Sequence, residues 1–373
     1  MKIGIDARLL SCPLTGIGRY TLEMCNALSK ILNISLYLYS PAPIRPEIAL
    51  DLEAINIRTM RWDNGLLRQL WTETYLPFWA KKDNVDVFWG TGHRLPRRLP
   101  KDMPRVVTIH DLVWKYAAGT MRPLSLILEK NQMPSAIKNA DHIVADTKAT
   151  ASAILNEFNI DLDKLSVVTP GVNQVLAAPD MELLHAKGLT HPYFLFVGTI
   201  EPRKNLTNLL SAYARLPEAL KMQTQLVVAG GKGWGGVNLQ GMVTHLNLDK
   251  YVRLLGYVDE PTLAALYANA RFLAMPSLYE GFGFPLVEAM AYGTPVLTAN
   301  NSSMPEVAGD AGLLVDAHDV GSISNGLEQL ISNDEILRGF SSKSKKNASR
   351  FNWDESAQKL MSVFETAISS RNG

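Results

Sequence analysis

Two carboxylates, Glu280 and Glu288, flank a glycine-containing segment in which ligand chemistry is expected. Gly281 and Gly283 let the backbone approach a bound molecule closely, and Pro285 suits the first position of a following helix. Amide groups at such a helix start favour anionic oxygens, whereas carboxylates accept paired hydrogen bonds from sugar diols. With Glu288 in the first turn, both carboxylates are expected to face one pocket. A helix-capping glutamate beside turn glycines is the alternative interpretation.

Two cations, Arg203 and Lys204, precede a second predicted helix and follow a strand that ends near Gly198. Asn205 is a suitable N-cap for this helix. Because the helix dipole disfavours positive charge at its N-terminus, two cations there indicate that an anion binds beside them. A diphosphate fits, since an arginine fork and a lysine point charge can share one group. The alternative is a solvated basic turn.

A third glycine pair, Gly16 and Gly18, precedes the first predicted helix. It matches a dinucleotide-binding fingerprint only in part, because Thr21 stands where the third glycine is required. The loop could present amides to a phosphate or form only a tight turn. His110 and Asp111 end another predicted strand, where a neutral imidazole could bond a sugar hydroxyl. A structural histidine is the alternative at that position.

Several other catalytic patterns are absent from the sequence. The glycine-rich stretch from 230 to 236 has no Walker lysine followed by serine or threonine, and no Gly-x-Ser-x-Gly elbow occurs. Asp161 and Asp163 lie in a polar turn and are not predicted to bind a metal. Cys12 and Cys25 are too few for a disulfide scaffold or a zinc site, and they indicate a reducing cytoplasm.

The elements that must hold these residues alternate between short apolar runs and helical patterns. The apolar runs predict buried parallel strands at Lys2 to Ile5, Ile34 to Tyr39, Val85 to Trp89, Arg105 to Ile109, His142 to Val144 and Ser166 to Val168. A second series follows at Tyr193 to Val197, Gln225 to Val228, Val252 to Leu255, Arg271 to Met275, Pro295 to Thr298 and Gly312 to Val315. Two doubly wound α/β domains in tandem are therefore predicted, with ligands at the carboxyl ends of their strands.

Length and composition agree with this organisation. At 373 residues the chain exceeds one ordinary core, and 47% hydrophobic with 20% charged residues indicates soluble globular domains. A net charge of +1 argues against a general nucleic-acid binder, which needs an excess of Lys and Arg. No signal peptide or membrane-spanning stretch is predicted, so a cytoplasmic location is expected.

The predicted domains are an N-terminal one over residues 1–175 and a C-terminal one over residues 176–350. The segment 172–191 has low periodicity and is the expected linker. Residues 351–373 contain a predicted amphipathic helix from Trp353 to Ile368.

Glu280 and Glu288, with the loop between them, resemble the E-x7-E signature of the retaining glycosyltransferases of family four, which have the GT-B fold. The resemblance covers nearly the whole chain, in motifs that follow one another in the family's order. The other similar motifs are Thr15 to Gly18, His110 with Asp111, Gly198 with Arg203 and Lys204, Leu255 to Val258, and Ser303 to Val307.

The resemblance implies a role for each matching position in binding a nucleotide-sugar donor. Glu288 would hold the ribose, and Glu280 would hold the hexose together with the backbone of Gly281, Phe282, Gly283 and Phe284. Arg203 and Lys204, beside Gly198, would neutralise the diphosphate in place of a metal ion, so neither a metal nor another cofactor is expected. The remaining positions are His110 near the reacting carbon, Gly16 and Gly18 over the diphosphate or the acceptor, and Gly256, Tyr257 and Val258 around the base.

The family also implies an acceptor site in the N-terminal domain, onto which the C-terminal helix returns. The specific expectation is transfer of mannose from GDP-mannose to a saccharide or lipid-linked saccharide, in polysaccharide, lipopolysaccharide or glycolipid synthesis. Two other classes stay open, a GT-B sugar-nucleotide epimerase and a non-catalytic nucleotide-sugar-binding module.

Peripheral contact with an anionic inner membrane surface is predicted from residues 58–105. Ten Lys or Arg and five Asp or Glu are interleaved there with Trp62, Trp71, Trp79 and Trp89. The alternative is that most of these tryptophans belong to the core.

Overall fold

The protein is described by a computed structural model that covers residues 1–50, 54–62, 64–173, 180–236 and 238–372. Two compact units form the chain. The first contains Met1–Leu112, Leu124–Gly171 and Asn352–Gly373, and the second contains Val113–Pro123 and Val172–Phe351. The segment Val113–Pro123 thus groups with the second unit, although its place in the sequence lies within the first predicted domain. The predicted break between residues 175 and 176 lies outside the described residues.

The first unit is built on a seven-stranded parallel sheet with the order β3-β2-β1-β4-β5-β6-β7. Its strands are β1 Lys2–Asp6, β2 Ser35–Ser40, β3 Ile55–Thr59, β4 Val87–Gly90, β5 Arg105–Ile109, β6 His142–Ala145 and β7 Leu165–Val167. Six of them overlap the predicted strands. The sequence analysis missed β3, because Ile55 is the only buried residue of this edge strand and no apolar pattern marks it.

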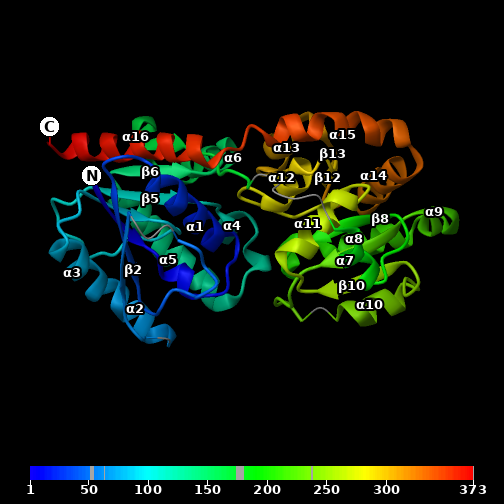
Figure 1. Cartoon of the computed structure of the whole chain (residues 1–373), viewed down its shortest axis with the longest axis horizontal. Helices are drawn as coiled ribbons and strands as arrows, with labels where there is room; N and C mark the ends of the chain where they lie inside the picture. The colour runs from blue at the N-terminus through cyan, green and yellow to red at the C-terminus, as the bar shows by residue number, and fades with distance from the viewer. Residues whose placement is uncertain (51–53, 63, 174–179, 237, 373) are drawn as a thin grey trace. The chain divides into compact units, whose positions relative to one another are not determined.

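Helices cover the sheet of the first unit because their apolar residues recur at helical spacing. They include α1 Gly16–Ser29, α2 Gly65–Glu73, α3 Tyr75–Lys82, α5 Pro123–Asn139, α6 Lys148–Glu157 and α16 Trp353–Asn372. The C-terminal α16 contacts α1 and lies along the sheet, where Phe364 meets Trp89 with 5.9 Å between ring centroids (Figure 1). Trp71 and Trp89 are fully buried, so these two of the four predicted surface tryptophans belong to the core.

The second unit has a six-stranded parallel sheet with the order β10-β9-β8-β11-β12-β13. Its strands are β8 Tyr193–Val197, β9 Gln225–Ala229, β10 Val252–Gly256, β11 Leu273–Met275, β12 Val296–Ala299 and β13 Gly312–Val315. Its helices are α4 Val113–Tyr116, α7 Met181–Ala186, α8 Leu206–Ala214, α9 Glu218–Gln223, α10 Leu239–His245, α11 Glu260–Asn269, α12 Phe284–Ala291, α13 Met304–Ala308, α14 Val320–Ser332 and α15 Asp334–Ala348. Across the described residues of the whole chain, no helix combines the length and apolar character needed to cross a membrane.

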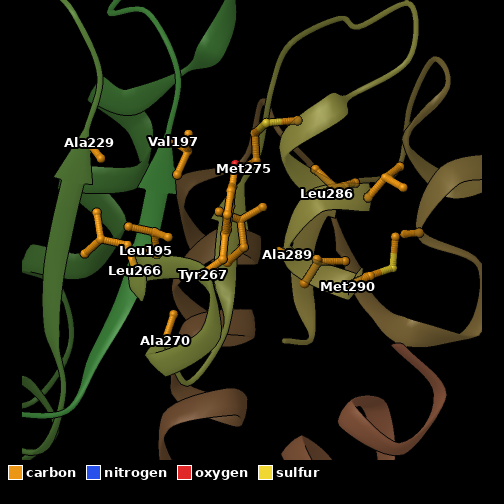
Figure 2. Close-up of a cluster of buried hydrophobic side chains, with 14 of the residues drawn as sticks. Leu195, Val197, Ala229, Leu266, Tyr267, Ala270, Met275, Leu286, Ala289 and Met290 are labelled. Carbon is orange, nitrogen blue, oxygen red and sulfur yellow. The ribbon is translucent and has the colours of Figure 1, made fainter. Parts of the chain in front are cut away.

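The core of the second unit fixes the helix that carries the E-x7-E motif. Successive residues of β8 point to opposite faces of the sheet, so Phe194 and Leu195 pack into different hydrophobic clusters. Figure 2 shows one of these clusters, in which Leu286 of α12 lies beside Met275 of β11 and Met290 lies farther along the same helix. Burial of each such side chain contributes about 2 kcal/mol to the stability of the fold. The start of α12 is thereby held at the carboxyl edge of the sheet.

Candidate functional site

Two loops of the second unit dock against each other at the carboxyl edge of its sheet. One runs from Gly198 to Asn205 after β8, and the other joins β11 to Glu280. The Asn205 side-chain amide donates to the carbonyl of Pro276 at 2.9 Å, and the Leu278 amide donates to the carbonyl of Arg203 at 2.9 Å. Asn205, predicted to cap α8, therefore uses its side chain to join the loops instead, and its φ of 61° is left-handed.

The docked loops bring Arg203, Lys204 and Glu280 into one buried charge cluster. Arg203 Nη1 lies 2.5 Å from Glu280 Oε2, and Lys204 Nζ lies 2.7 Å from Oε1. Only 6% of the Glu280 side chain is exposed. Burial alone would raise the pKa of Glu280, but the Arg203 and Lys204 cations outweigh it and lower that pKa to about 2. Glu280 is therefore an ionised acceptor at neutral pH.

Glu201 and Trp234 hold the far side of the Arg203 guanidinium, which the sequence analysis did not foresee. Arg203 Nη2 donates to Glu201 Oε1 at 2.8 Å, and the Trp234 indole donates to Glu201 Oε2 at 3.2 Å. The glycine-rich stretch around Trp234 is needed for close approach, since a Cβ on Gly230 would lie 1.9 Å from the carbonyl oxygen of Gly198. A tryptophan within a glycine-rich stretch was the feature of the sequence that could have indicated this contact.

Neighbouring residues fix the backbone around Glu280. The Glu280 amide donates to Ser302 Oγ at 3.1 Å, and Ser303 Oγ donates to the Glu280 carbonyl at 2.9 Å. Gly283 has a φ of 101°, a left-handed conformation that favours glycine. The helix α12 begins directly after it at Phe284, so Pro285 is its second residue.

Glu288 lies at the start of the second turn of α12, beyond the first turn in which the sequence analysis expected it. The Tyr267 hydroxyl donates to Glu288 Oε2 at 2.7 Å. Both carboxylates of the motif are thus on or beside one helix, and each is oriented by a different set of partners.

The predicted base-binding residues lie at the same sheet edge but on another strand. Gly256 ends β10, which stands three positions from β11 in the sheet order. Tyr257 is 83% exposed, and Val258 packs against the hydrophobic core. Gly198 does adjoin the charge cluster, because a Cβ built on it would lie 3.6 Å from Lys204 Cε.

In the first unit, Gly16 and Gly18 form the first turn of α1 rather than a loop ahead of it. Thr15 stands at the N-cap position without a side-chain capping bond. The turn approaches the end of β4, since a Cβ on Gly92 would lie 3.3 Å from the Ile17 side chain.

His110 is held by protein acceptors on both sides of its ring. Nδ1 lies 2.6 Å from Asp146 Oδ2, and Nε2 lies 2.7 Å from the carbonyl oxygen of Thr91. The buried ring also meets Tyr20 edge to face, with 4.7 Å between centroids. A neutral imidazole can donate to only one of these two acceptors. The geometry therefore differs from the predicted neutral ring that offers a nitrogen to a sugar, because both nitrogens already face protein oxygens.

The two parallel sheets with their connecting helices define a GT-B fold, and the loops at the strand ends of the second unit carry the buried cluster of Arg203, Lys204 and Glu280. Residues 14–175 match the family described as Glycosyltransferase Family 4, and residues 184–347 match Glycosyl transferases group 1. The chain belongs to the family-four glycosyltransferases, and its activity is glycosyl transfer.

Similar proteins cover the chain from end to end. It is 32% identical to the O-antigen chain mannosyltransferase B of Escherichia coli, over 98% of this chain and 100% of that protein. The fold is similar to the sucrose-phosphate synthase of Thermosynechococcus elongatus, with a TM-score of 0.79, 20% identity and 99% of each chain covered. It is also similar to Anabaena HepE in complex with UDP and glucose, with a TM-score of 0.75, 16% identity, and 98% and 99% covered.

Proposed function

We propose that the protein transfers mannose, with retention of configuration, from GDP-mannose to a saccharide or lipid-linked saccharide acceptor in O-antigen or related surface-polysaccharide synthesis. The observation that carries the donor site is the buried cluster of Arg203, Lys204 and Glu280 at the carboxyl edge of the sheet. The choice of mannose rests on the E. coli relative, whose named activity is that of an O-antigen chain mannosyltransferase.

In this proposal, different residues of the second unit bind different parts of the donor. Arg203 and Lys204 bind the diphosphate, with amides of the Gly281–Phe284 segment supplying further donors at the start of α12. Glu280 accepts hydrogen bonds from hexose hydroxyls, and Glu288 accepts them from the ribose. Gly198 allows close approach, and Gly256 to Val258 line the base. In the first unit, Gly16 and Gly18 contribute amides toward the diphosphate or the acceptor.

The reaction breaks the bond between the anomeric carbon and the diphosphate oxygen and forms one to the acceptor oxygen on the same face. The departing diphosphate takes the proton of the acceptor hydroxyl, so no protein base is required. Arg203 and Lys204 stabilise the negative charge that develops on the leaving oxygen. With its pKa lowered to about 2 by these cations against the effect of burial, Glu280 carries no proton to donate and acts as a hydrogen-bond acceptor.

We assign His110 a positioning role in the first unit. Its contacts with Thr91 and Asp146 join the ends of β4, β5 and β6 at one edge of the sheet. A direct bond from Nε2 to a donor sugar would require exchange of the Thr91 contact.

Peripheral membrane contact is a further part of the proposal. Leu70 of α2 and Phe78 of α3 are 52% and 59% exposed, within the basic stretch 58–105. Wild-type protein should sediment with anionic liposomes at low salt, and the Leu70→Ala/Phe78→Ala variant should sediment less. Leu32→Ala, which removes an exposed leucine elsewhere, is the control. Equal sedimentation of all three proteins would contradict this surface.

The donor site is tested by calorimetric titration with GDP-, UDP- and ADP-hexoses in the absence of metal. GDP-mannose should bind at least about tenfold more tightly than the other donors, a difference of about 1.4 kcal/mol. Selective binding of a UDP-hexose, the nucleotide of the HepE complex, would replace the proposed donor. A second assay follows product formation with acceptor saccharides, because donor conversion without acceptor would indicate an epimerase. Binding of no donor would contradict the site itself.

A further inference from the structure

A pocket of about 540 Å³ lies in the second unit, away from the charge cluster. Three segments line it: the end of α11 with the residues that lead to β11, the turn between α12 and β12, and one face of α15. Arg271 lies two residues before β11 and Pro295 directly precedes β12, which puts the pocket at the amino edge of the parallel sheet. Glu280 follows β11 and lies at the opposite edge. The pocket is therefore separate from the proposed donor site.

The lining of this pocket is cationic. Arg271, Arg338 and Lys345 contribute to it, and none of the described residues that line it carries a carboxylate. Within the described residues, Arg338 and Lys345 form no ion pair. Arg271 pairs with Asp334 through Nη2 at 2.6 Å, but its buried Nε has no hydrogen-bond partner in the described part of the chain.

Hydroxyl groups and a close turn give the pocket a fixed shape. Ser341 Oγ donates to the carbonyl of Gly293 at 2.8 Å and so ties α15 to the turn after α12. Gly293 has a φ of 87°, and a Cβ there would lie 3.2 Å from Lys345 Cε. Thr294 and Leu337 form the buried floor. The volume falls in the range of about 300–1,000 Å³ that is typical of small-molecule sites.

We propose that this pocket binds a small phosphate monoester. Cations from two separate segments can converge on one phosphate, with arginine forks matching its oxygens and the lysine adding a point charge. Serine hydroxyls and the turn leave polar groups for the body of the ester.

Contacts also join the pocket to Glu288. Tyr292 of the pocket stacks on Tyr267, with 6.2 Å between ring centroids, and Thr294 Oγ1 donates to the Tyr267 carbonyl at 2.6 Å. The Tyr267 hydroxyl binds Glu288. Occupancy of the pocket is therefore linked to donor affinity through Tyr267. This linkage rests on the proposed function of Glu288, whereas phosphate binding does not.

The binding test is calorimetry of the whole protein with glucose 6-phosphate, inorganic phosphate and neutral glucose as probes. The pocket variant is Arg338→Ala/Lys345→Ala. The matched control, Lys343→Ala/Lys346→Ala, removes two exposed charges from the same helix outside the pocket. Glucose 6-phosphate should bind wild type and control equally and the pocket variant at least about tenfold more weakly. Equal affinity in the two double variants, or equal binding of glucose, would overturn the site. If inorganic phosphate bound as tightly as glucose 6-phosphate, the proposal of a phosphate monoester would be wrong, and the pocket would be a site for free phosphate.

The linkage is tested by measuring the dissociation constant of the donor with and without saturating glucose 6-phosphate. A change of about threefold or more is expected in wild type and in the Lys343→Ala/Lys346→Ala control, and none in the pocket variant. An unchanged donor affinity in wild type that binds the ester would overturn the linkage. Failure of all donors to bind would contradict the proposed function, while the calorimetry without donor still decides the pocket.

Discussion

The charge cluster of the second unit and the contacts of His110 with Asp146 and Thr91 in the first unit are built differently. Both lie where parallel strands end, Glu280 after β11 and His110 after β5. Glu280 lies 2.5 and 2.7 Å from the cationic ends of Arg203 and Lys204, and Arg203 also pairs with Glu201. His110 is held between a backbone carbonyl and a buried carboxylate.

The difference is that the charge cluster is held by ion pairs between side chains, whereas the His110 ring is fixed in part by a backbone carbonyl. A side chain that is paired with a neighbouring opposite charge can turn toward a diphosphate instead, because the new ion pair replaces the attraction of the old one. A ring whose two nitrogens face fixed acceptors must lose a bond before it can make a new one. Substitutions in the second unit should therefore affect turnover most, and those around His110 should affect folding most.

The largest effect is expected from Arg203→Ala/Lys204→Ala. Each lost donor to the leaving group should lower kcat by about a hundredfold or more, so kcat/KM should fall by at least about a thousandfold. Steady-state kinetics with the donor identified above measure this. Arg215→Ala, an exposed cation at the end of α8, is the control and should keep wild-type rates. A double variant that folds and retains full turnover would remove the charge cluster from the mechanism.

The same cluster predicts a pH effect on stability. The cations around Glu280 outweigh its burial and lower its pKa in the folded state to about 2, below the ordinary carboxylate value. Its contribution is therefore complete above the unfolded pKa and is lost as the pH falls from about 4.5 to about 2. Wild type should lose about 3 kcal/mol more of its unfolding free energy over this interval than Glu280→Gln does. Urea unfolding across the interval checks this, and parallel curves for the two proteins would contradict the ionised, paired state.

Asp146→Asn tests the other side of the comparison. Loss of the charged partner of His110 should lower the free energy of unfolding by about 2 kcal/mol while kcat/KM changes by less than about threefold. Thermal or urea unfolding and steady-state kinetics are measured on the same preparation. A hundredfold loss of kcat/KM at unchanged stability would instead make His110 a catalytic contact.

The sequence predicts twelve of the thirteen strands that the described residues form, because buried parallel strands carry continuous apolar runs. It missed β3, which buries only Ile55 at an exposed edge. It also could not pair Glu280 with Arg203, since these residues are 77 positions apart and meet only where the loops after β8 and β11 dock at one edge of the sheet. The partners of His110 are also distant in the sequence, 36 positions for Asp146 and 19 for Thr91, because they come from two other strand ends.

Side chains with two possible uses were the other source of error. Asn205 is of a residue type that is favoured at N-cap positions, but its side-chain amide bridges two loops in the folded chain. Trp234 was passed over in a glycine-rich stretch, although its indole reaches Glu201. Local propensity cannot choose between such uses, because the deciding partner lies elsewhere in the sequence.

A smaller effect is expected from Tyr267→Phe. It removes the hydroxyl that donates to Glu288 at 2.7 Å and leaves the ring in place. Donor affinity should fall by about fivefold, the equivalent of about 1 kcal/mol, with kcat little changed. Calorimetry measures the affinity, and Tyr75→Phe is the control, because Tyr75 is 40% exposed and lies in the first unit outside the proposed donor site. A larger loss in kcat than in affinity would place Glu288 at the reacting bond rather than at the ribose.

The smallest effect is expected from removal of divalent metal. Arg203 and Lys204 supply two protein-borne positive charges where the proposal puts the leaving diphosphate, so an excess of EDTA should change kcat by less than about twofold. The comparison is sharpened by adding Mg²⁺ to Arg203→Ala/Lys204→Ala, because an ion that replaced the two side chains would restore part of the lost rate. If EDTA abolished wild-type turnover and Mg²⁺ restored it, the cluster would be a partner of a metal rather than its substitute, and the role of Glu280 would shift from hydrogen-bond acceptor to ligand.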